Sequence, residues 1–232
     1  MMILQMNKIE KAFGKVIVIK DFSLKVNEEE ILCIIGPSGC GKSTMLNMIS
    51  GNLTPSKGEL VNKSKNISYV FQEDRLLPWK SVYENIHIVN RKNTKDQIKA
   101  LIERVGLEGF ENYYPVNLSG GMRQRCSIAR GFNYEADLLL MDEPFKSLDY
   151  NLRFTMIEHL LNLWEMKRNS IIFVTHEIDE ALLLGDRILV LSNRPTKIIK
   201  EFKIKKLKRE RNLKDETLMK IRSEIVDCIV KY

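Results

Sequence analysis

Hydrophobic positions along the chain form continuous runs in some places and helical stripes in others. Continuous apolar runs occupy residues 31–35 (ILCII), 137–141 (DLLLM) and 170–175 (SIIFVT). Such runs are expected of strands that are buried on both faces of a parallel sheet. Residues 186–192 (DRILVLS) predict a further strand, and residues 16–26 (VIVIKDFSLKV) alternate in the manner of a half-buried strand.

The helical stripes lie between these runs. Residues 94–105 (TKDQIKALIERV) carry hydrophobic residues on one helical face, and Thr94 with Gln97 predicts a capping box at the helix start. Residues 42–50 (KSTMLNMIS) predict a second helix. An amphipathic helix is predicted by a stripe that consists of Leu152, Ile157, Leu160, Leu161 and Trp164. A C-terminal helix packed on the core is predicted by a second stripe, which consists of Leu218, Ile221, Ile225 and Ile229.

The order of these elements predicts the fold class. Strands that alternate with helices indicate an α/β protein with a mainly parallel sheet. The block from about 73 to 130 breaks the alternation, so we expect it to be a helical lobe inserted into the core. We expect residues 1–232 to form one domain, with a basic tail and terminal helix at about 205–232.

Composition narrows the class of protein. With 44% hydrophobic and 29% charged residues, the composition is that of an ordinary soluble globular protein, and no apolar stretch reaches the roughly 18–20 residues of a membrane span. The N-terminal residues have charges too early and an apolar run too short for a secretory signal, so a cytoplasmic location is expected. The four cysteines have no metal-binding spacing and are expected to be reduced thiols; they are Cys33, Cys40, Cys126 and Cys228.

The net charge of +7 is concentrated in one segment. Residues 197–211 hold eight Lys or Arg and two Glu, a local charge of +6 that leaves +1 for the rest of the chain. This distribution argues against a basic groove for nucleic acid. Two alternatives remain for the segment: a solvated strand and linker, or contact with anionic lipid headgroups beside a membrane partner.

A glycine-rich sequence, GPSGCGKST at residues 36–44, follows a predicted buried strand and opens a predicted helix. Strand, glycine loop and helix in this order predict a phosphate-binding loop. Gly36, Gly39 and Gly41 would let the backbone wrap closely around a phosphate, with N–H groups and a helix N-terminus directed at the anion.

The side chains of this loop have predicted roles as well. Lys42 would supply a positive charge for the β- and γ-phosphates, and the Ser43 hydroxyl would coordinate Mg²⁺. Cys40 would be either a redox sensor or, as we favour, a small filler that contributes only its backbone amide. The predicted cradle is completed by Pro37, Ser38 and Thr44.

Two adjacent carboxylates end the buried run in LLLMDEP. In a protein with a phosphate-binding loop, Asp142 would orient Mg²⁺ and Glu143 would polarise the attacking water. A base held over water implies hydrolysis rather than transfer to an acceptor. The alternative for this pair is an acidic turn before Pro144.

His176 in FVTHE and Gln72 in YVFQE also follow predicted strands. Ligands of α/β proteins bind at this edge of the sheet, so His176 would hold the γ-phosphate and water in position. Gln72 would reach Mg²⁺ and the water. Taken alone, His176 would be a helix cap, and Gln72 is a weak signal.

A second glycine sequence, NLSGGMRQR at residues 117–125, looks like a phosphate-binding loop without its lysine. With the motifs above, it makes the whole chain resemble the ATP-binding subunit of an ABC transporter, in which LSGGM is the signature motif. The resemblance implies a P-loop NTPase core with a mainly parallel sheet, an N-terminal antiparallel β portion and the inserted helical lobe. It also implies ATP and Mg²⁺ as cofactors, and hydrolysis of ATP.

In that family two subunits pair head to tail. Ser119, Gly120 and Gly121 of one chain would therefore face the nucleotide held by Lys42 of the other. The signature sequence would supply the hydroxyl, amides and helix N-terminus that the opposite γ-phosphate lacks. The second loop needs no lysine because it completes the partner's site.

Other positions match the family one by one. Phe13 in KAFG resembles the aromatic residue that stacks on adenine, although a core phenylalanine is the alternative. Asp149 matches the loop that crosses the dimer axis. His176 matches the switch histidine, and Gln72 matches the loop that links the catalytic site to the helical lobe.

Two stretches resemble one subfamily, the importers of the nitrate, sulfonate and taurine type: QEDRLLPW at 72–79 and GDRILVLSNRPTKI at 185–198. The resemblance implies a homodimer on the inner face of the membrane beneath integral-membrane permease subunits, supplied indirectly by an extracytoplasmic solute-binding protein. Trp79 would lie where the family meets its permease, whereas composition alone predicts a core residue.

The sequence departs from the family at three positions. Met122 replaces the usual glutamine of the signature, which puts only a side-chain contact in doubt. Lys146 stands where a small residue is usual before Asp149, in the loop whose contacts cross the dimer in the family. Glu29 replaces a common turn glycine.

Two other functions compete with the importer ATPase. A soluble ABC-type ATPase acting on nucleic acid or the ribosome is opposed by the single cassette, the lack of a coiled-coil insertion and the charge confined to one tail. A P-loop kinase for a small metabolite leaves the signature sequence and His176 unexplained. We therefore expect an importer ATPase that does not bind nucleic acid.

Overall fold

The computed structural model describes residues 1–146 and 148–231, which divide into two compact units. The first unit comprises residues 1–65 together with the chain from Asn169 onward. The second unit comprises residues 66–168. The α/β fold class predicted from the strand and helix order is confirmed, with both parallel and antiparallel strand pairs.

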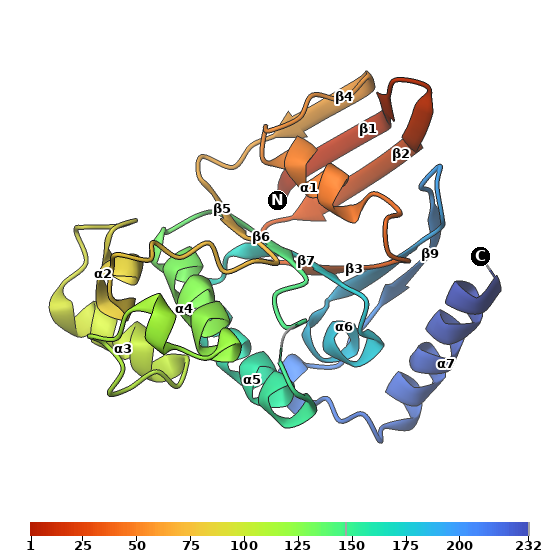
Figure 1. The fold of residues 1–232 in the computed structure, drawn as a ribbon. Coiled ribbons are helices and arrows are strands. Elements are labelled where there is room, and N and C mark those ends of the chain that lie inside the picture. Colours follow the sequence, from red (N-terminus) through yellow and green to blue (C-terminus); the bar gives the residue numbers. More distant parts are fainter. Residues whose placement is uncertain (147, 232) are drawn as a thin grey trace. The chain divides into compact units, whose positions relative to one another are not determined.

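An antiparallel sheet forms the N-terminal part of the first unit (Figure 1). Strand β1 (Met2–Phe13) lies between β2 (Val16–Asn27) and β4 (Lys57–Asn62). In the second half of β2, Phe22, Leu24 and Val26 are buried while the residues between them are exposed. The alternation seen in the sequence therefore corresponds to one buried and one solvated face.

A second sheet of this unit has β3 (Ile31–Ile35) next to β7 (Ser170–Thr175) and β8 (Arg187–Leu191), both parallel to it. Strand β9 (Ile198–Lys203) pairs antiparallel with β8. Every residue of β3 and β7 is buried, as continuous apolar runs predict for central strands. The strands predicted at 31–35 and 170–175 have the observed bounds.

The first unit also contains the helices α1 (Lys42–Ile49), α6 (Ile178–Leu184) and α7 (Glu216–Lys231) and the short 3₁₀ helix η2 (Lys208–Glu210). Helix α7 packs against α6 and the strands β8 and β9. Of the four residues in its predicted stripe, Leu218 and Ile225 are buried. Its apolar face is therefore only partly covered within this unit.

The basic segment 197–211 is held by contacts within the same unit. Lys200 pairs with Glu224 at 2.6 Å, Lys206 pairs with Asp215, and Lys208 pairs with Asp186. The Arg211 guanidinium is buried and donates to the carbonyl oxygens of Leu182, Leu183 and Gly185 at the end of α6, where a cation is favourable. The strand of the first alternative is present as β9, in which Lys200 and Lys203 are exposed, while these tertiary contacts hold part of the segment that follows it.

The second unit has two parallel strands, β5 (Ile67–Val70) and β6 (Leu138–Asp142), and the helices α2 (Val82–His87), α3 (Lys95–Arg104), α4 (Gly120–Asn133) and α5 (Tyr150–Lys167). A 3₁₀ turn, η1 (Pro115–Asn117), precedes α4. The predicted capping box at Thr94 and Gln97 is present, and Ser81 with Glu84 forms another. Helices α2, α3 and α4 lie within or at the end of the block from 73 to 130.

A buried amide shapes the loop before α2. The Asn85 side chain accepts from the N–H of Leu77 at 2.8 Å and donates to the carbonyl oxygens of Leu77, Lys80 and Ser81. This loop carries Trp79, whose side chain is 70% exposed. The core position that composition predicts for Trp79 is therefore wrong.

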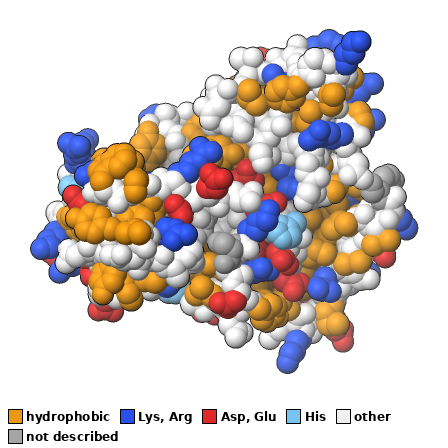
Figure 2. All heavy atoms as spheres, in the orientation of Figure 1, with side chains coloured by type: hydrophobic (Ala, Val, Ile, Leu, Met, Phe, Trp, Pro, Cys, Tyr) orange, Lys and Arg blue, Asp and Glu red, His pale blue; other side chains and the backbone are white. Residues whose placement is uncertain are grey.

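Hydrophobic side chains gather over the region of α2 and α3 in Figure 2. Exposed hydrophobic residues near these helices include Trp79, Tyr113, Tyr114 and Val116. In the part of the chain that the structure describes, no helix is both long and apolar enough to cross a membrane.

Candidate nucleotide-binding site

The glycine sequence forms a turn between β3 and α1 in the first unit. Gly41 has φ +121°, and a Cβ atom there would lie 2.9 Å from Val18 Cγ1 and 3.1 Å from Thr196 Oγ1. Gly39 also has a positive φ, +74°. These positions need glycine because side chains at such φ values are strained and, at Gly41, would collide with neighbours.

Lys42 is 5% exposed and opens α1. Its Nζ donates to the carbonyl oxygens of Gly36 at 2.7 Å and Pro37 at 2.9 Å, so the ammonium lies within the curve of the loop. Ser38, Gly39 and Ser43 are exposed at the rim. An ammonium inside an open glycine loop at a helix N-terminus fits a phosphate group, and the Ser43 hydroxyl is an oxygen donor of the kind Mg²⁺ prefers.

Cys40 is buried beneath this loop. Its Sγ would lie 3.1 Å from a Cβ atom on Gly36, so it fills the space under the turn. Burial raises the pKa of the Cys40 thiol, with Lys42 acting in the opposite direction. A protonated thiol in this position is unreactive, which favours the filler over the redox sensor.

The segment after β8 contacts the phosphate loop. Arg194 Nε donates to the Gly39 carbonyl oxygen. The Thr196 hydroxyl lies within hydrogen-bond reach of the carbonyl oxygens of Cys40 and, at 2.9 Å, Val18. The sequence had indicated these residues only as part of a subfamily likeness, because no local pattern relates them to the loop.

His176 lies at the same sheet edge as the phosphate loop. Ile35 of β3 pairs with Thr175 of β7, so Gly36 and His176 both follow this pair of residues. The His176 Nε2 is 3.6 Å from the Glu177 carboxylate. The Thr175 hydroxyl accepts from the Glu177 N–H at 3.0 Å and donates to the buried Glu180 at 2.5 Å, which fixes the turn that carries the histidine.

Phe13 ends β1 in the first unit. Its ring is 48% exposed, and the Lys11 ammonium lies 5.0 Å from the ring centroid. The alternative of a core phenylalanine is therefore wrong. An exposed ring at this position is free to present a face to a planar base.

The two predicted carboxylates lie in the second unit. Asp142, at the end of β6, is buried and accepts from the Tyr69 hydroxyl at 3.4 Å. Burial and the Asp142 charge together raise the pKa of Tyr69, so the phenol remains a donor. No sequence motif relates Tyr69 to Asp142. Their proximity follows only from the pairing of β5 with β6.

Glu143 follows with φ +47°, an unusual backbone conformation for a residue with a side chain. Its carboxylate is mostly buried, and Oε2 lies 3.0 Å from the Lys146 ammonium. Lys146, which stands where the family usually has a small residue, is therefore an ion-pair partner of the predicted base. The sequence alone relates Lys146 only to contacts across the dimer and does not reveal this ion pair.

The signature sequence begins α4. Ser119 is the N-cap residue, and its hydroxyl accepts from the Met122 N–H at 3.3 Å. Ser119 and Gly120 are exposed, so the start of this 14-residue helix is open to solvent. A Cβ atom on Gly121 would lie 2.9 Å from Leu148 Cδ2, so a larger residue there would require the Leu148 side chain to shift.

Asp149 and Gln72 have different settings in the same unit. Asp149 is the N-cap residue of α5, where its carboxylate accepts from the Leu152 N–H at 2.9 Å. Gln72 is exposed in the loop after β5. Because Val70 pairs with Met141, the segments leading to Gln72 and Asp142 leave the same edge of this strand pair.

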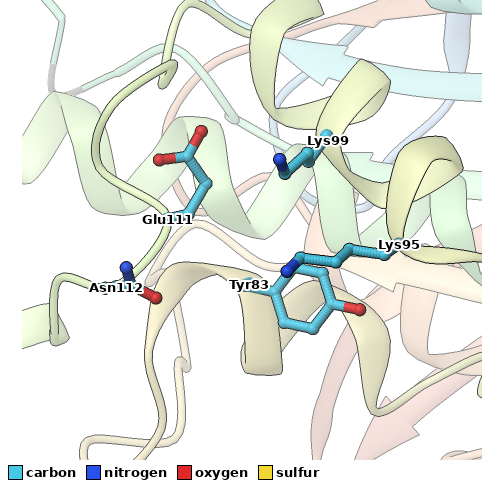
Figure 3. A pocket seen from close by; sticks show the side chains of 5 residues that line it. All are labelled: Tyr83, Lys95, Lys99, Glu111 and Asn112. Carbon is cyan, nitrogen blue, oxygen red and sulfur yellow. The ribbon is translucent and has the colours of Figure 1, made fainter.

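A separate hollow of 490 Å³ opens on the second unit, lined by Tyr83, Lys95, Lys99, Glu111 and Asn112 (Figure 3). Figure 3 shows the Lys95 side chain extending beside the Tyr83 ring. Its lining includes none of the predicted site residues. The nucleotide hypothesis therefore depends on the loops at the strand ends and not on this hollow.

Comparison with known proteins identifies relatives over almost the whole chain. The aliphatic sulfonates import ATP-binding protein SsuB of a Bacillus cereus strain is 40% identical over 239 residues, covering 97% of this chain and 95% of the relative. SsuB 2 of Burkholderia cenocepacia is 36% identical, with 99% and 88% covered.

Solved structures agree with these relatives. The ATP-binding cassette MJ0796, in a dimeric post-hydrolysis state bound to ADP and phosphate, superposes with a TM-score of 0.75. It is 28% identical, and the match covers 88% of this chain and all of that one. A family profile, that of the ABC transporter, matches residues 19–146. With this match and the 40% identity to SsuB, the chain belongs to the ABC transporter family, as an ATPase cassette.

Proposed function

We propose that this protein is the ATP-hydrolysing subunit of an importer that takes up an aliphatic sulfonate or a related small anion. The observation that carries the proposal is the glycine loop between β3 and α1 with Lys42 inside it. The names of the relatives support import, and support aliphatic sulfonates as the first substrates to test.

In this proposal the phosphate chain of ATP lies in the loop at residues 36–44. Lys42 exchanges its contacts with the Gly36 and Pro37 carbonyls for phosphate oxygens, which are stronger, charged acceptors. The exposed ring of Phe13 stacks on the adenine. The nucleotide thereby replaces internal contacts of the loop with charge-assisted ones.

Hydrolysis requires a base, a metal ion and a polar group for the γ-phosphate. Asp142, Ser43 and Gln72 would hold Mg²⁺, which neutralises charge on the phosphates. Glu143 takes a proton from the attacking water, after its ion pair with Lys146 opens. His176 positions the γ-phosphate and the water.

A second copy of the chain completes each site. The exposed start of α4, with Ser119 and Gly120, offers N–H groups and a helix dipole to an anion, but no ammonium. An incomplete anion site is useful where a partner supplies the missing charge. The dimeric state of the similar cassette MJ0796 supports a homodimer, and the exposed, incomplete anion site at the start of α4 supports head-to-tail pairing.

Contact with membrane-embedded permease subunits is assigned to the exposed hydrophobic residues near α2. Trp79, Tyr113, Tyr114 and Val116 present apolar area that a lone soluble protein does not need, since large exposed patches usually mark interaction sites. The buried amide of Asn85 fixes the loop that carries Trp79. A fixed loop is suited to docking because little order is lost on binding.

The alternative of an ATPase acting on nucleic acid is not favoured. The relatives are import ATP-binding proteins, and four basic residues of the segment 197–211 are engaged in contacts within the chain. At least half of the eight basic residues of this segment are therefore engaged within the chain, which leaves fewer of them to contact phosphate backbones.

The proposal is tested with Glu143→Gln, which keeps the size of the side chain and removes the base. We expect turnover of ATP to fall about a hundredfold or more, with ATP binding retained. Glu108→Gln is the matched control, since Glu108 is an exposed glutamate of the same unit with no predicted role. Equal turnover in the two variants would remove Glu143 from the reaction.

The dimer is tested with the same variant. In ATP without Mg²⁺, the Glu143→Gln protein is expected to double in mass by light scattering, and a further Ser119→Arg change should prevent this. A dimer that forms equally well with Arg at this position would contradict the role of the signature sequence. Uptake of labelled sulfonates by cells that lack the subunit then tests the substrate.

A further inference from the structure

The segment after β8 reaches across the first unit to the phosphate loop. Arg194 and Thr196 contact the carbonyl oxygens of Gly39 and Cys40, which are 155 and 156 residues away in the chain. The segment is itself fixed, because the Thr196 N–H donates to Val18 O at 2.8 Å and the Lys197 N–H donates to Ser192 Oγ at 3.0 Å.

These contacts determine how two peptide groups of the loop are oriented. In a trans peptide the C=O and the following N–H point in opposite directions. Because Thr196 holds the Cys40 carbonyl, the N–H of Gly41 is directed away from the segment. Because Arg194 holds the Gly39 carbonyl, the next peptide N–H, that of Cys40, is directed toward Pro37 O at 3.2 Å.

The two side chains contribute differently. Thr196 is 1% exposed and is part of the packing beneath Gly41. Arg194 is exposed, and its Nη2 lies 3.6 Å from the position that a Cβ atom on Gly39 would take. Arg194 therefore places a permanent positive charge at the rim of the loop, while only its Nε–H is used in the hydrogen bond to Gly39.

We propose that Arg194 is a positioning residue for nucleotide binding, which fixes the Gly39–Cys40 peptide and adds positive charge at the rim of the phosphate loop. This inference rests on the proposed binding of ATP by that loop. A loop already held in shape loses less freedom when it binds a phosphate. The charge also favours an anion over water at the rim.

The test compares Arg194→Gln with Lys197→Gln, measured by ATP affinity and by the urea midpoint of unfolding. Lys197 is an exposed cation three residues after Arg194. Within the described residues, no contact joins the Lys197 side chain to the phosphate loop. Arg194→Gln is expected to weaken ATP binding about threefold to tenfold, while the loss of one exposed hydrogen bond should lower the unfolding midpoint only slightly. In steady state the KM for ATP should rise while kcat stays unchanged.

Arg194→Lys separates the two contributions, since it keeps the charge and loses the Nε donor; its affinity should be intermediate. Unchanged ATP affinity in Arg194→Gln would overturn the inference, as would an equal loss in Lys197→Gln, which would indicate net charge alone. If the unmodified protein itself does not bind ATP, the proposed function fails instead, so the two failures are distinguishable.

Discussion

Replacing Gly41 by alanine tests whether the phosphate loop is shaped by its neighbours in the first unit. Gly41 lies at φ +121°, where L-residues are strained, and its added methyl group would meet Val18 Cγ1 at 2.9 Å and Thr196 Oγ1 at 3.1 Å. Val18 and Thr196 are both buried, so neither has much room to move aside. The substitution therefore combines a backbone penalty with overpacking.

The magnitude follows from these two contributions. The backbone conformation costs about 1–3 kcal/mol and the overpacking about 1–3 kcal/mol, so the free energy of unfolding should fall by about 2–6 kcal/mol. Gly51→Ala is the matched control: Gly51 has φ +81°, but a Cβ atom there has no neighbour within 4 Å. That variant should lose only the backbone part, about 1–3 kcal/mol.

Urea unfolding followed by far-ultraviolet circular dichroism measures the difference, since both tryptophans, Trp79 and Trp164, lie in the second unit. Displacement of a fluorescent ATP analogue reports binding, which Gly41→Ala should weaken and Gly51→Ala should not. If the two variants lose equal stability, the contacts with Val18 and Thr196 do not constrain the loop. Adding Val18→Ala to Gly41→Ala should restore part of the loss, because the collision is relieved.

Two further predictions concern charged side chains. Lys146→Ala removes the ion pair that Glu143 must open before it acts as a base. The ATPase rate should therefore rise by up to about fivefold, which corresponds to the free energy of a partly exposed ion pair. A fall in rate would mean that Lys146 assists the reaction. The Arg187 guanidinium hydrogen-bonds the Glu201 carboxylate at 3.0 Å and lowers the pKa of Glu201. Because a lowered carboxyl pKa stabilises the fold above the unfolded pKa of about 4.3, wild type should exceed Glu201→Gln by up to about 1 kcal/mol at pH 7. This advantage should disappear as the pH falls through the folded pKa of Glu201. Urea unfolding of both proteins at pH 7 and below pH 4 measures it. A stability difference between wild type and Glu201→Gln that is the same at both pH values would contradict the prediction.

Several elements could be predicted because their signals are local. The runs at 31–35 and 170–175 became β3 and β7 with the same bounds, and Thr94 with Gln97 formed the predicted capping box. Such patterns depend on residues within one or two turns of each other, or on burial along a single strand. The glycine loop was equally recognisable, because only glycine readily adopts the backbone conformations that such a loop requires.

Burial of single side chains was less predictable. Trp79 is of a residue type that is expected in a core, but its side chain is 70% exposed. The loop that carries it is held by hydrogen bonds of Asn85 and not by packing of the indole ring. Phe13 is exposed although phenylalanine is usually buried. A residue type gives only an average tendency, whereas the exposure of one side chain depends on the loop geometry around it.

The sequence by itself determined the strands β2, β3, β6, β7 and β8, most of the helices, the phosphate loop and the signature sequence, and through these motifs the family. Only the tertiary structure decided which distant groups meet these motifs: Arg194 and Thr196 at the glycine loop, and Tyr69 at Asp142. Hydrophobic periodicity is a property of neighbouring residues and remains visible in the unfolded chain. Hydrogen-bond partners 73 to 156 residues apart have no such periodicity, because only strand pairing and packing bring them within reach.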